Sequence, residues 1–446
     1  MVDCTVNDGL EALGAADAAA RAWARTAPRR RADVLHRVFA LMKERREELA
    51  TLITLEVGKT LAEARGEVDY AADYVRWYAE EAVRAGGRST ATPEGTSHIV
   101  TVTEPVGPCL LITPWNVPLA MATRKVAPAV AAGCTVVVKP ADLTPLVTLA
   151  FGQIVLDAGA PPGVVCVVPT TNAADVCAAI MADPRLRKVS FTGSTPVGRL
   201  LLAQAAPRVL RTSMELGGNA PFVVFDDAHL DVAVEQAVIA KMRLGGQSCV
   251  AANRFLVQEG IADAFVHRLG ERLAAVRVGP GLDDESDLGP LIDQRAVAKA
   301  TRLVEDAVSR GAVVVARAQQ PSGPADGHYF APVVLDHVPV GAAIMEEEVF
   351  APVAAVHRFA DEEEAIELAN ATEHGLAAYV VTRDLGRAQR VASRLEAGMV
   401  GVNRGLISNV AAPFGGIKQS GLGREGGAEG LAEYQQLKYL SVPAFS

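Results

Sequence analysis

The chain of 446 residues has no long apolar stretch and no excess of positive charge, and these two absences exclude several classes of protein. Its apolar runs, such as Leu110–Thr113 and Thr135–Val138, are far too short to cross a bilayer. Acidic residues interrupt residues 1–30, so we expect no secretory signal there. Lys and Arg number 43 against 52 Asp and Glu, and this net charge of −9 argues against nucleic acid or an anionic membrane as the main partner. The sequence therefore predicts a cytoplasmic protein.

Cysteine is scarce as well. The six cysteines stand at positions 4, 109, 134, 166, 177 and 249, without a CxxC pair and without zinc-ligand spacing to a histidine. This usage excludes a disulfide scaffold, and we expect no metal site. Half of the residues are apolar and 21% are charged, an ordinary globular balance, and the length predicts two or three domains.

Helical and strand-like patterns alternate along the chain. Apolar residues recur every three or four positions over 34–55 and 61–83, which predicts amphipathic helices. An alternating segment at His98–Val102, followed by prolines, favours an exposed hairpin. Beyond it, short apolar runs separated by helical segments are typical of parallel strands buried on both faces, as in a doubly wound α/β sheet. The first series comprises Leu110–Thr113, Thr135–Val138, Val164–Val168, Val189–Thr192 and Phe222–Phe225, and the second comprises Phe255–Val257, Val313–Ala316, Val353–Val356, Tyr379–Thr382 and Met399–Val402.

The segment Gly193–Gly198 joins a predicted strand to a predicted helix. Thr195 can cap this helix and Pro196 fits its first turn. The helix N-terminus can then hold a pyrophosphate, because Gly193 permits a close backbone approach. An ordinary strand-to-helix turn has the same pattern, however, and the GxGxxG spacing of the commonest dinucleotide fingerprint is absent.

Three further patterns contain residue types suited to carbonyl chemistry. Cys249 follows small and polar residues at 245–248, which leave room for a substrate and for backbone donors beside a thiolate. Glu215 lies between apolar residues at a predicted strand end, where burial raises a carboxyl pKa toward that of a general base. Asn116 closes a strand at the carboxyl edge of the sheet, and its amide can donate to an oxyanion. Taken singly, the three are equally typical of an inert buried thiol, a surface Glu and a turn Asn.

Seven motifs in one order resolve these ambiguities. They are PWN at 114–116, KPA at 139–141, FTGST at 191–195, MELGGN at 214–219, GQSC at 246–249, EEVFAPV at 347–353 and PFGGIKQSGLGREGG at 413–427. Through them the chain, from about residue 10 to its end, resembles the NAD(P)-dependent aldehyde dehydrogenase superfamily, and in particular its succinate-semialdehyde dehydrogenase branch.

This resemblance implies an aldehyde dehydrogenase-like α/β fold with two doubly wound domains and a small β oligomerisation extension. The implied dinucleotide-binding domain covers residues 1–86 and 106–217, and the catalytic domain covers 218–420. The implied oligomerisation strands lie at 87–105 and 435–446, so we expect a homodimer or homotetramer.

The resemblance also implies the roles of individual residues. Cys249 matches the nucleophile, Asn116 with the Cys249 backbone N–H matches the oxyanion hole, and Glu215 matches the base that activates the deacylating water. A glutamate base argues against transfer of the acyl group to coenzyme A. Asp142 stands where family members usually have Glu, and such a carboxylate favours NAD over NADP because it repels a 2′-phosphate. The full set of implied cofactor contacts is Trp115, Lys139, Asp142, Gly193, Ser194, Glu348 and Phe350.

Arg124, Arg243 and Ser408 match the residues that bind the distal carboxylate of succinate semialdehyde in that branch. A guanidinium pair suits a carboxylate, although both arginines could instead pair with the protein's own carboxylates. The prediction is oxidation of a short carboxylated semialdehyde, a small-molecule aldehyde such as succinate semialdehyde, to the acid. The alternatives are a dehydrogenase for aromatic or neutral aliphatic aldehydes and a non-catalytic binding protein with the same fold.

Overall fold

The computed structural model describes residues 2–319, 323–324 and 327–444. Four helices open the chain: α1 (Val6–Arg25), α2 (Pro28–Glu44), α3 (Arg46–Val57) and α4 (Leu61–Glu81). The apolar periodicity over 34–55 belongs to α2 and α3, which meet at Arg45. Gly58, at φ 87°, ends α3 in the left-handed conformation that glycine adopts without strain. The Thr60 hydroxyl then caps α4 by accepting the N–H of Glu63.

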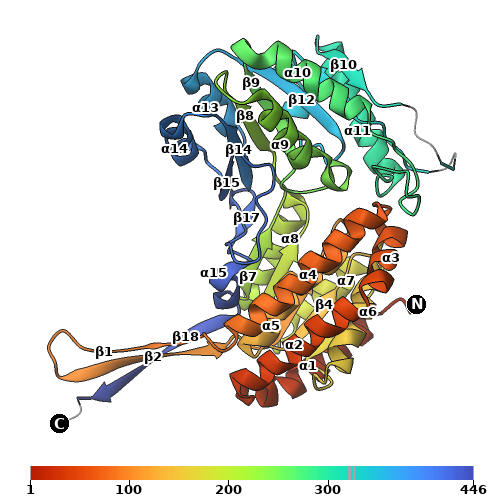
Figure 1. Ribbon diagram of the computed structural model, residues 1–446. Coiled ribbons are helices and arrows are strands. Elements are labelled where there is room, and N and C mark those ends of the chain that lie inside the picture. Colours follow the sequence, from red (N-terminus) through yellow and green to blue (C-terminus); the bar gives the residue numbers. More distant parts are fainter. Residues whose placement is uncertain (1, 320–322, 325–326, 445–446) are drawn as a thin grey trace.

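A six-stranded sheet lies beside these helices (Figure 1), in the order β17-β7-β6-β3-β4-β5. All of its pairs are parallel except β17 with β7. Its central strands are buried along their whole length, which explains their unalternating apolar sequences. The strands are β3 (Cys109–Ile112), β4 (Val136–Lys139), β5 (Val165–Val167), β6 (Lys188–Thr192), β7 (Arg211–Glu215) and β17 (Gly421–Leu422), and the helices and 3-10 turn between them are α5 (Pro118–Ala132), α6 (Pro145–Asp157), α7 (Ala173–Ala182), α8 (Thr195–Ala205) and η1 (Ala206–Arg208).

A second sheet of seven strands forms the other half of the molecule, in the order β10-β11-β12-β9-β8-β14-β15. The run Phe222–Phe225, which the sequence pattern groups with the first series, lies largely in β8 of this second sheet. The sequence pattern did not predict β11. The chain passes from one sheet to the other at residues 216–219. The strands are β8 (Ala220–Val224), β9 (Ala252–Gln258), β10 (Val313–Arg317), β11 (Val333–Asp336), β12 (Val353–Phe359), β14 (Ala377–Val381) and β15 (Met399–Val402).

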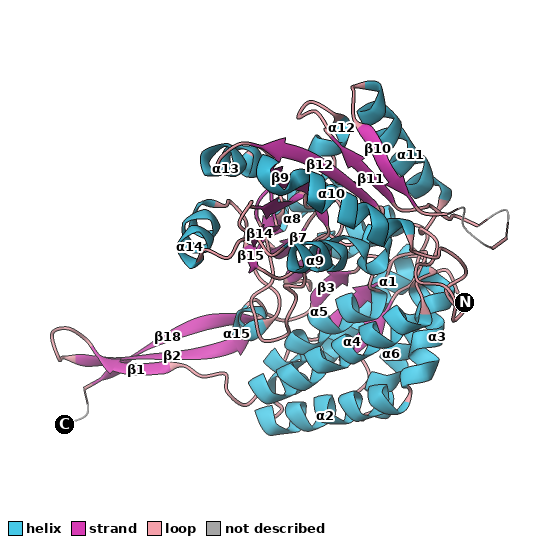
Figure 2. Cartoon of the chain, turned by 45° about the horizontal axis from the view of Figure 1, so that its top comes forward, coloured by secondary structure: helices cyan, strands magenta, loops and turns pink. Residues whose placement is uncertain are grey.

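Helices cover this second sheet, and short elements connect it back to the first (Figure 2). The helical elements are α9 (Leu230–Met242), the 3-10 turn η2 (Arg243–Gly246), α10 (Glu259–Ala274), α11 (Gln294–Ser309), α12 (Ala343–Glu346), α13 (Glu362–Asn370) and α14 (Leu385–Arg394). The last helix, α15 (Gly427–Ala432), packs instead against α4 and α5 of the first half. The strand pair β13 (His374–Gly375) and β16 (Ile417–Lys418) precedes β17, so residues after 420 return to the six-stranded sheet.

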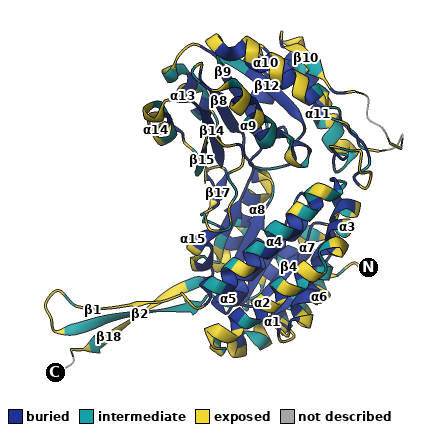
Figure 3. Ribbon diagram, viewed as in Figure 1, coloured by how far each residue is buried: buried dark blue, intermediate teal, exposed yellow. Residues whose placement is uncertain are grey.

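A three-stranded antiparallel sheet projects from the body: β1 (Arg88–Ala91), β2 (Ser97–Pro105) and β18 (Gln435–Pro443). Figure 3 colours this extension as exposed or half-buried, in contrast to the dark cores of the two larger sheets. The hairpin predicted at His98–Val102 is therefore confirmed as β2 with its partner β1. The final strand expected within 435–446 is observed as β18, and residues 445–446 lie outside the described residues.

Within the part of the chain that the structure describes, no helix combines the length and the hydropathy that a membrane crossing requires. The cytoplasmic location stays a prediction.

Candidate active site

A cavity of about 740 Å³ opens where the carboxyl ends of the first sheet's strands face the second sheet. The segments after β3, β6 and β7 contribute to its wall, as expected for a ligand site in an open α/β sheet. Every site residue predicted from the sequence lines it, with the exception of Lys139. These lining residues are Trp115, Asn116, Arg124, Asp142, Gly193, Ser194, Glu215, Arg243, Cys249, Glu348, Phe350 and Ser408.

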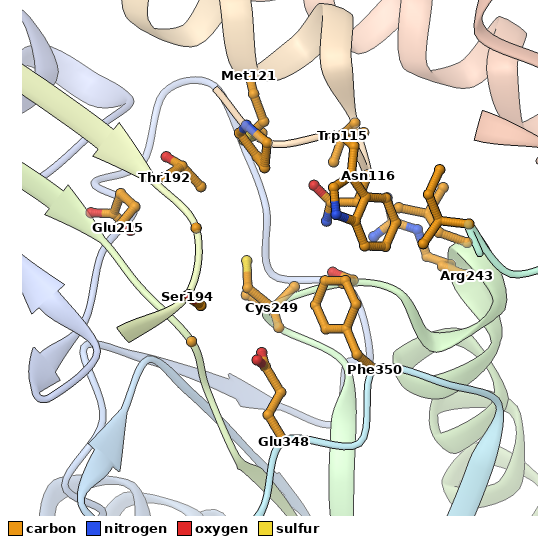
Figure 4. A pocket seen from close by; sticks show the side chains of 18 of the residues that line it. Trp115, Asn116, Met121, Thr192, Ser194, Glu215, Arg243, Cys249, Glu348 and Phe350 are labelled. Atoms are coloured by element: carbon orange, nitrogen blue, oxygen red, sulfur yellow. The ribbon is translucent and has the colours of Figure 1, made fainter. Parts of the chain in front are cut away.

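Cys249 lies at the middle of this wall. In Figure 4, Glu215 and Thr192 are on one side of its sulfur, and Asn116, Trp115 and Arg243 are on the other. It is half-buried, and none of the other five cysteines lines the cavity. Burial raises the pKa of Cys249 to about 12, Arg124 acts in the opposite direction, and Glu348 and Glu215 add to the rise. The resting thiol is therefore protonated and must lose its proton before it can act as a nucleophile.

Asn116 is held through both its side chain and its backbone. Its Nδ2 donates to the Gln247 carbonyl at 2.8 Å, which ties it to the loop that carries Cys249. Its backbone carbonyl accepts from Lys59 Nζ at 2.7 Å, and the same ammonium is 2.6 Å from Glu67 Oε2. The Glu67 carboxylate also accepts the N–H of Leu119 at the start of α5. Since an amide carries two N–H hydrogens, one remains for a ligand.

Glu215 ends β7 as a buried carboxyl. Burial raises its pKa well above the usual value, and the neighbouring Glu425 raises it further. Its Oε2 has no hydrogen-bond partner among the described residues. A Cβ on Gly415, which is at φ 155°, would lie 2.8 Å from Glu215 Oε1, so this carboxyl needs a glycine beside it. A raised pKa suits a base that works near neutrality.

The two candidate arginines differ sharply. Arg124 is buried, its Nε lies 2.5 Å from Glu425 Oε2, and its guanidinium stacks 4.2 Å from the centre of the Phe414 ring. It therefore forms the internal ion pair that the sequence left open as an alternative, although it also lines the cavity. Arg243 is exposed and, among the described residues, makes no hydrogen bond or ion pair. Ser408 is half-buried in the same wall.

Glu348 and Phe350 line the cavity from the second domain. Burial raises the pKa of Glu348 to about 7, while the Gly218 N–H, Lys299 and Lys241 act against this rise. Its Oε1 accepts the Gly218 N–H at 3.1 Å. The Phe350 ring meets Trp115 edge-on, with 5.6 Å between ring centres. An apolar wall beside an ionisable carboxylate matches the ring and ribose of a nicotinamide nucleotide.

The residues around α8 fit a pyrophosphate. Gly193 and Ser194 line the cavity directly before this helix. The N-cap is Ser194, and not Thr195 as the sequence predicted, and Ser194 makes no side-chain capping bond to the N–H groups of the first turn. The hydroxyl of Thr192 is buried there without a partner among the described residues. Asp142 is exposed at the cavity, whereas Lys139 is buried and its pKa is lowered by burial. These features fit a dinucleotide, with Lys139 outside the observed wall.

The sequence analysis missed three residues of this centre: Glu425, Lys125 and Glu63. Glu425 Oε1 lies 2.5 Å from Lys125 Nζ, and this buried pair is the charged neighbour of Glu215. Glu425 stands within the motif at 413–427. Only the folded chain, however, shows that Glu425 and Lys125, which are 300 positions apart, are in contact.

Comparison with known proteins agrees with this geometry. The aldehyde dehydrogenase family model matches residues 1–440. The chain belongs to the aldehyde dehydrogenase family. A succinate-semialdehyde dehydrogenase of Paenarthrobacter nicotinovorans is 56% identical over 442 residues, which cover 99% of this chain and 98% of the relative. An NADP-dependent succinate-semialdehyde dehydrogenase of Escherichia coli strain K12 is 47% identical, over 97% of this chain and 89% of the relative.

Solved structures show the same fold. The crystal structure of a succinate-semialdehyde dehydrogenase from Burkholderia pseudomallei is 48% identical and superposes with a TM-score of 0.96, covering 99% of this chain and 91% of that one. The expected fold class and the expected enzyme class, an NAD(P)-dependent aldehyde dehydrogenase, are thereby confirmed.

The Lys59–Glu67 pair is testable through stability. Both side chains are almost fully buried, so Lys59→Met leaves an unpaired buried carboxylate and should destabilise the fold by about 3 kcal/mol or more. Lys43→Met is the matched control, because its pair with Asp69 is exposed and should contribute less than about 1 kcal/mol. Thermal unfolding, with cofactor held constant, checks both variants. If the two variants had equal thermal midpoints, the larger stabilisation expected from the buried Lys59–Glu67 pair would be contradicted.

Proposed function

We propose that this dehydrogenase oxidises a short aldehyde with a carboxylate at its far end, and that succinate semialdehyde is its substrate. The observation that carries the proposal is Arg243. It lies in the cavity wall six positions before Cys249, and its guanidinium forms no ion pair among the described residues, although the Glu63 carboxyl is near enough to interact with its charge. A free guanidinium beside a nucleophile is suited to a bidentate contact with a substrate carboxylate. The substrates named for the two relatives above support the same choice.

The proposed reaction begins with Cys249. Its thiol releases its proton to water in the cavity. The sulfur then forms a bond to the aldehyde carbon as the carbonyl π bond opens. The negative charge that develops on the carbonyl oxygen is stabilised by Asn116 Nδ2 and the Cys249 backbone N–H, because fixed donors cost little reorganisation. Trp115, Ser194, Glu348 and Phe350 would hold a nicotinamide nucleotide in the cavity, where it would supply the acceptor for the hydride of that carbon. The product on Cys249 is then a thioester.

Glu215 completes the reaction by hydrolysis. As general base it takes a proton from a water molecule, whose oxygen adds to the thioester carbon and displaces the Cys249 sulfur as the leaving group. Overall the aldehyde and one water yield a carboxylic acid, a hydride transferred to the nucleotide and one released proton, and the thiol is restored. A buried base with a raised pKa favours this hydrolytic route over transfer to coenzyme A.

The cofactor we propose is NAD, with NADP as the alternative. Asp142 is exposed at the cavity and three positions after Lys139. A carboxylate there can accept a hydrogen bond from a ribose 2′-hydroxyl and repels a 2′-phosphate. We accordingly propose that the domain with the six-stranded sheet binds the cofactor and that the domain with the seven-stranded sheet carries the catalytic cysteine.

The proposal includes assembly into a homodimer or homotetramer through the three-stranded extension. β18 is an edge strand with large exposed side chains, among them Leu437 and Tyr439. A second copy of the chain can cover this edge, which would otherwise offer unpaired backbone groups.

Arg243→Ala tests the substrate class. Loss of a charge-assisted contact should lower kcat/KM for succinate semialdehyde by about 10- to 100-fold, mainly through KM, and should change kcat/KM for butanal by less than about 3-fold. Arg272→Ala, an exposed arginine on α10 away from the cavity, is the control. Equal losses on both aldehydes would contradict the carboxylate contact and favour a neutral or aromatic substrate.

Asp142→Ala tests the cofactor preference. The unmodified enzyme should show a kcat/KM for NAD at least about 10-fold above that for NADP, and the variant should narrow this ratio because the repulsion of the 2′-phosphate is removed. Steady-state rates with each cofactor measure it, and Asp284→Ala, also exposed, is the control. A parent enzyme that uses NADP as well as NAD would show that Asp142 does not discriminate.

A further inference from the structure

The turn that carries Arg243 has an unusual backbone. Leu244, at φ 57° and ψ 26°, and Gly245, at φ 63°, are both left-handed, and Gly246 follows at φ 74°. The left-handed region is unfavourable for a leucine, so this turn needs contacts that hold it. The turn joins Arg243 to Gln247, whose carbonyl accepts from Asn116. Its conformation therefore sets where the guanidinium lies relative to the reacting centre.

A side chain from the other domain holds this turn. Glu63, in the first turn of α4, accepts the backbone N–H of Leu244 through Oε1 at 2.6 Å. Its Oε2 is buried without a hydrogen-bond partner among the described residues, and Glu63 lines the same cavity. Burial raises the pKa of Glu63, whereas the Leu244 N–H and the charges of Lys59 and Arg243 act against this rise. Glu63 thus lies close enough to interact electrostatically with Arg243.

We propose that Glu63 is a positioning residue for recognition of the substrate carboxylate. By accepting the Leu244 N–H, it holds the 243–247 turn in the conformation that presents Arg243 to the cavity. This inference rests on the proposed function, since it assigns Glu63 a role through Arg243.

Docking of α4 against the second domain does not depend on Glu63 alone. The Leu61 N–H donates to the Gly281 carbonyl at 2.9 Å, and Gly289 packs closely against the backbone of Gly58. Replacing Glu63 therefore leaves a separate contact between the domains. A loss confined to one class of substrate would then reflect the turn, not the assembly of the two domains.

The test compares Glu63→Ala with Glu63→Gln on succinate semialdehyde and butanal. Alanine removes the acceptor, so KM for succinate semialdehyde should rise about 10-fold while kcat/KM for butanal changes by less than about 3-fold. Glutamine keeps a carbonyl oxygen that can accept the Leu244 N–H, so it should stay within about 3-fold of the parent on both aldehydes. Glu80→Ala, on the same helix but away from the cavity, is the matched control.

Thermal midpoints are measured for every variant, and Glu63→Asp, which keeps the charge but shortens its reach, replaces the alanine variant if the latter does not fold. Equal losses on both aldehydes, no loss at all, or failure of glutamine to restore KM would each overturn the proposal.

Combining Glu63→Ala with Arg243→Ala separates this inference from the proposed function. If Glu63 acts through Arg243, the double variant should lose no more selectivity than Arg243→Ala alone, whereas additive losses would overturn the positioning role. Should Arg243→Ala be selective and Glu63→Ala not, only the positioning role fails. Should Arg243→Ala itself be unselective, the proposed function fails.

Discussion

The hydrogen bond from Asn116 Nδ2 to the Gln247 carbonyl is the interaction on which the site depends. Asn116 follows β3 of the first sheet, whereas Gln247 stands two positions before Cys249 in the second domain. This bond therefore fixes the proposed oxyanion donor relative to the proposed nucleophile across the domain boundary. Lys59, which is paired with Glu67, donates to the backbone carbonyl of Asn116. Because this pair is buried, it holds the Asn116 backbone rigidly. Rigid donors of this kind are what electrostatic stabilisation of an oxyanion requires.

Burial has a second consequence, since it raises the pKa values of the thiol and of the two carboxyls that line the cavity. The pKa of Cys249 is raised to about 12, that of Glu348 to about 7, and that of Glu215 well above its usual value. These shifts disfavour the presence of several close negative charges in a poorly solvated cavity. The buried cations nearby are already paired with Glu425, as Arg124 and Lys125 show. Arg243 is exposed and forms no ion pair among the described residues, and it is the guanidinium that we propose for the substrate anion.

Much of this could be predicted from the sequence because local patterns determine it. Unalternating β-branched runs marked most of the buried strands, and the ordered motifs placed Cys249, Glu215 and Asn116 in one reaction class. β11 (Val333–Asp336) was missed although it is as short and as buried as β3 and β4, which the same pattern marked. The pairing of Arg124 with Glu425 and the hold of Glu63 on Leu244 join residues far apart in the chain. No spacing rule encodes such contacts, and a left-handed leucine is not expected from its residue type.

The central claim is that Cys249, Glu215 and Asn116 act on one carbonyl group. Mass spectrometry of Glu215→Gln, mixed with succinate semialdehyde and NAD, tests it most directly. Glutamine cannot remove the proton from the deacylating water, so the thioester should accumulate. We expect about one equivalent of reduced cofactor to form rapidly per active site, after which the enzyme stalls with a succinyl group on the Cys249 peptide. An unmodified Cys249 peptide, an adduct on another cysteine, or undiminished turnover would contradict the account.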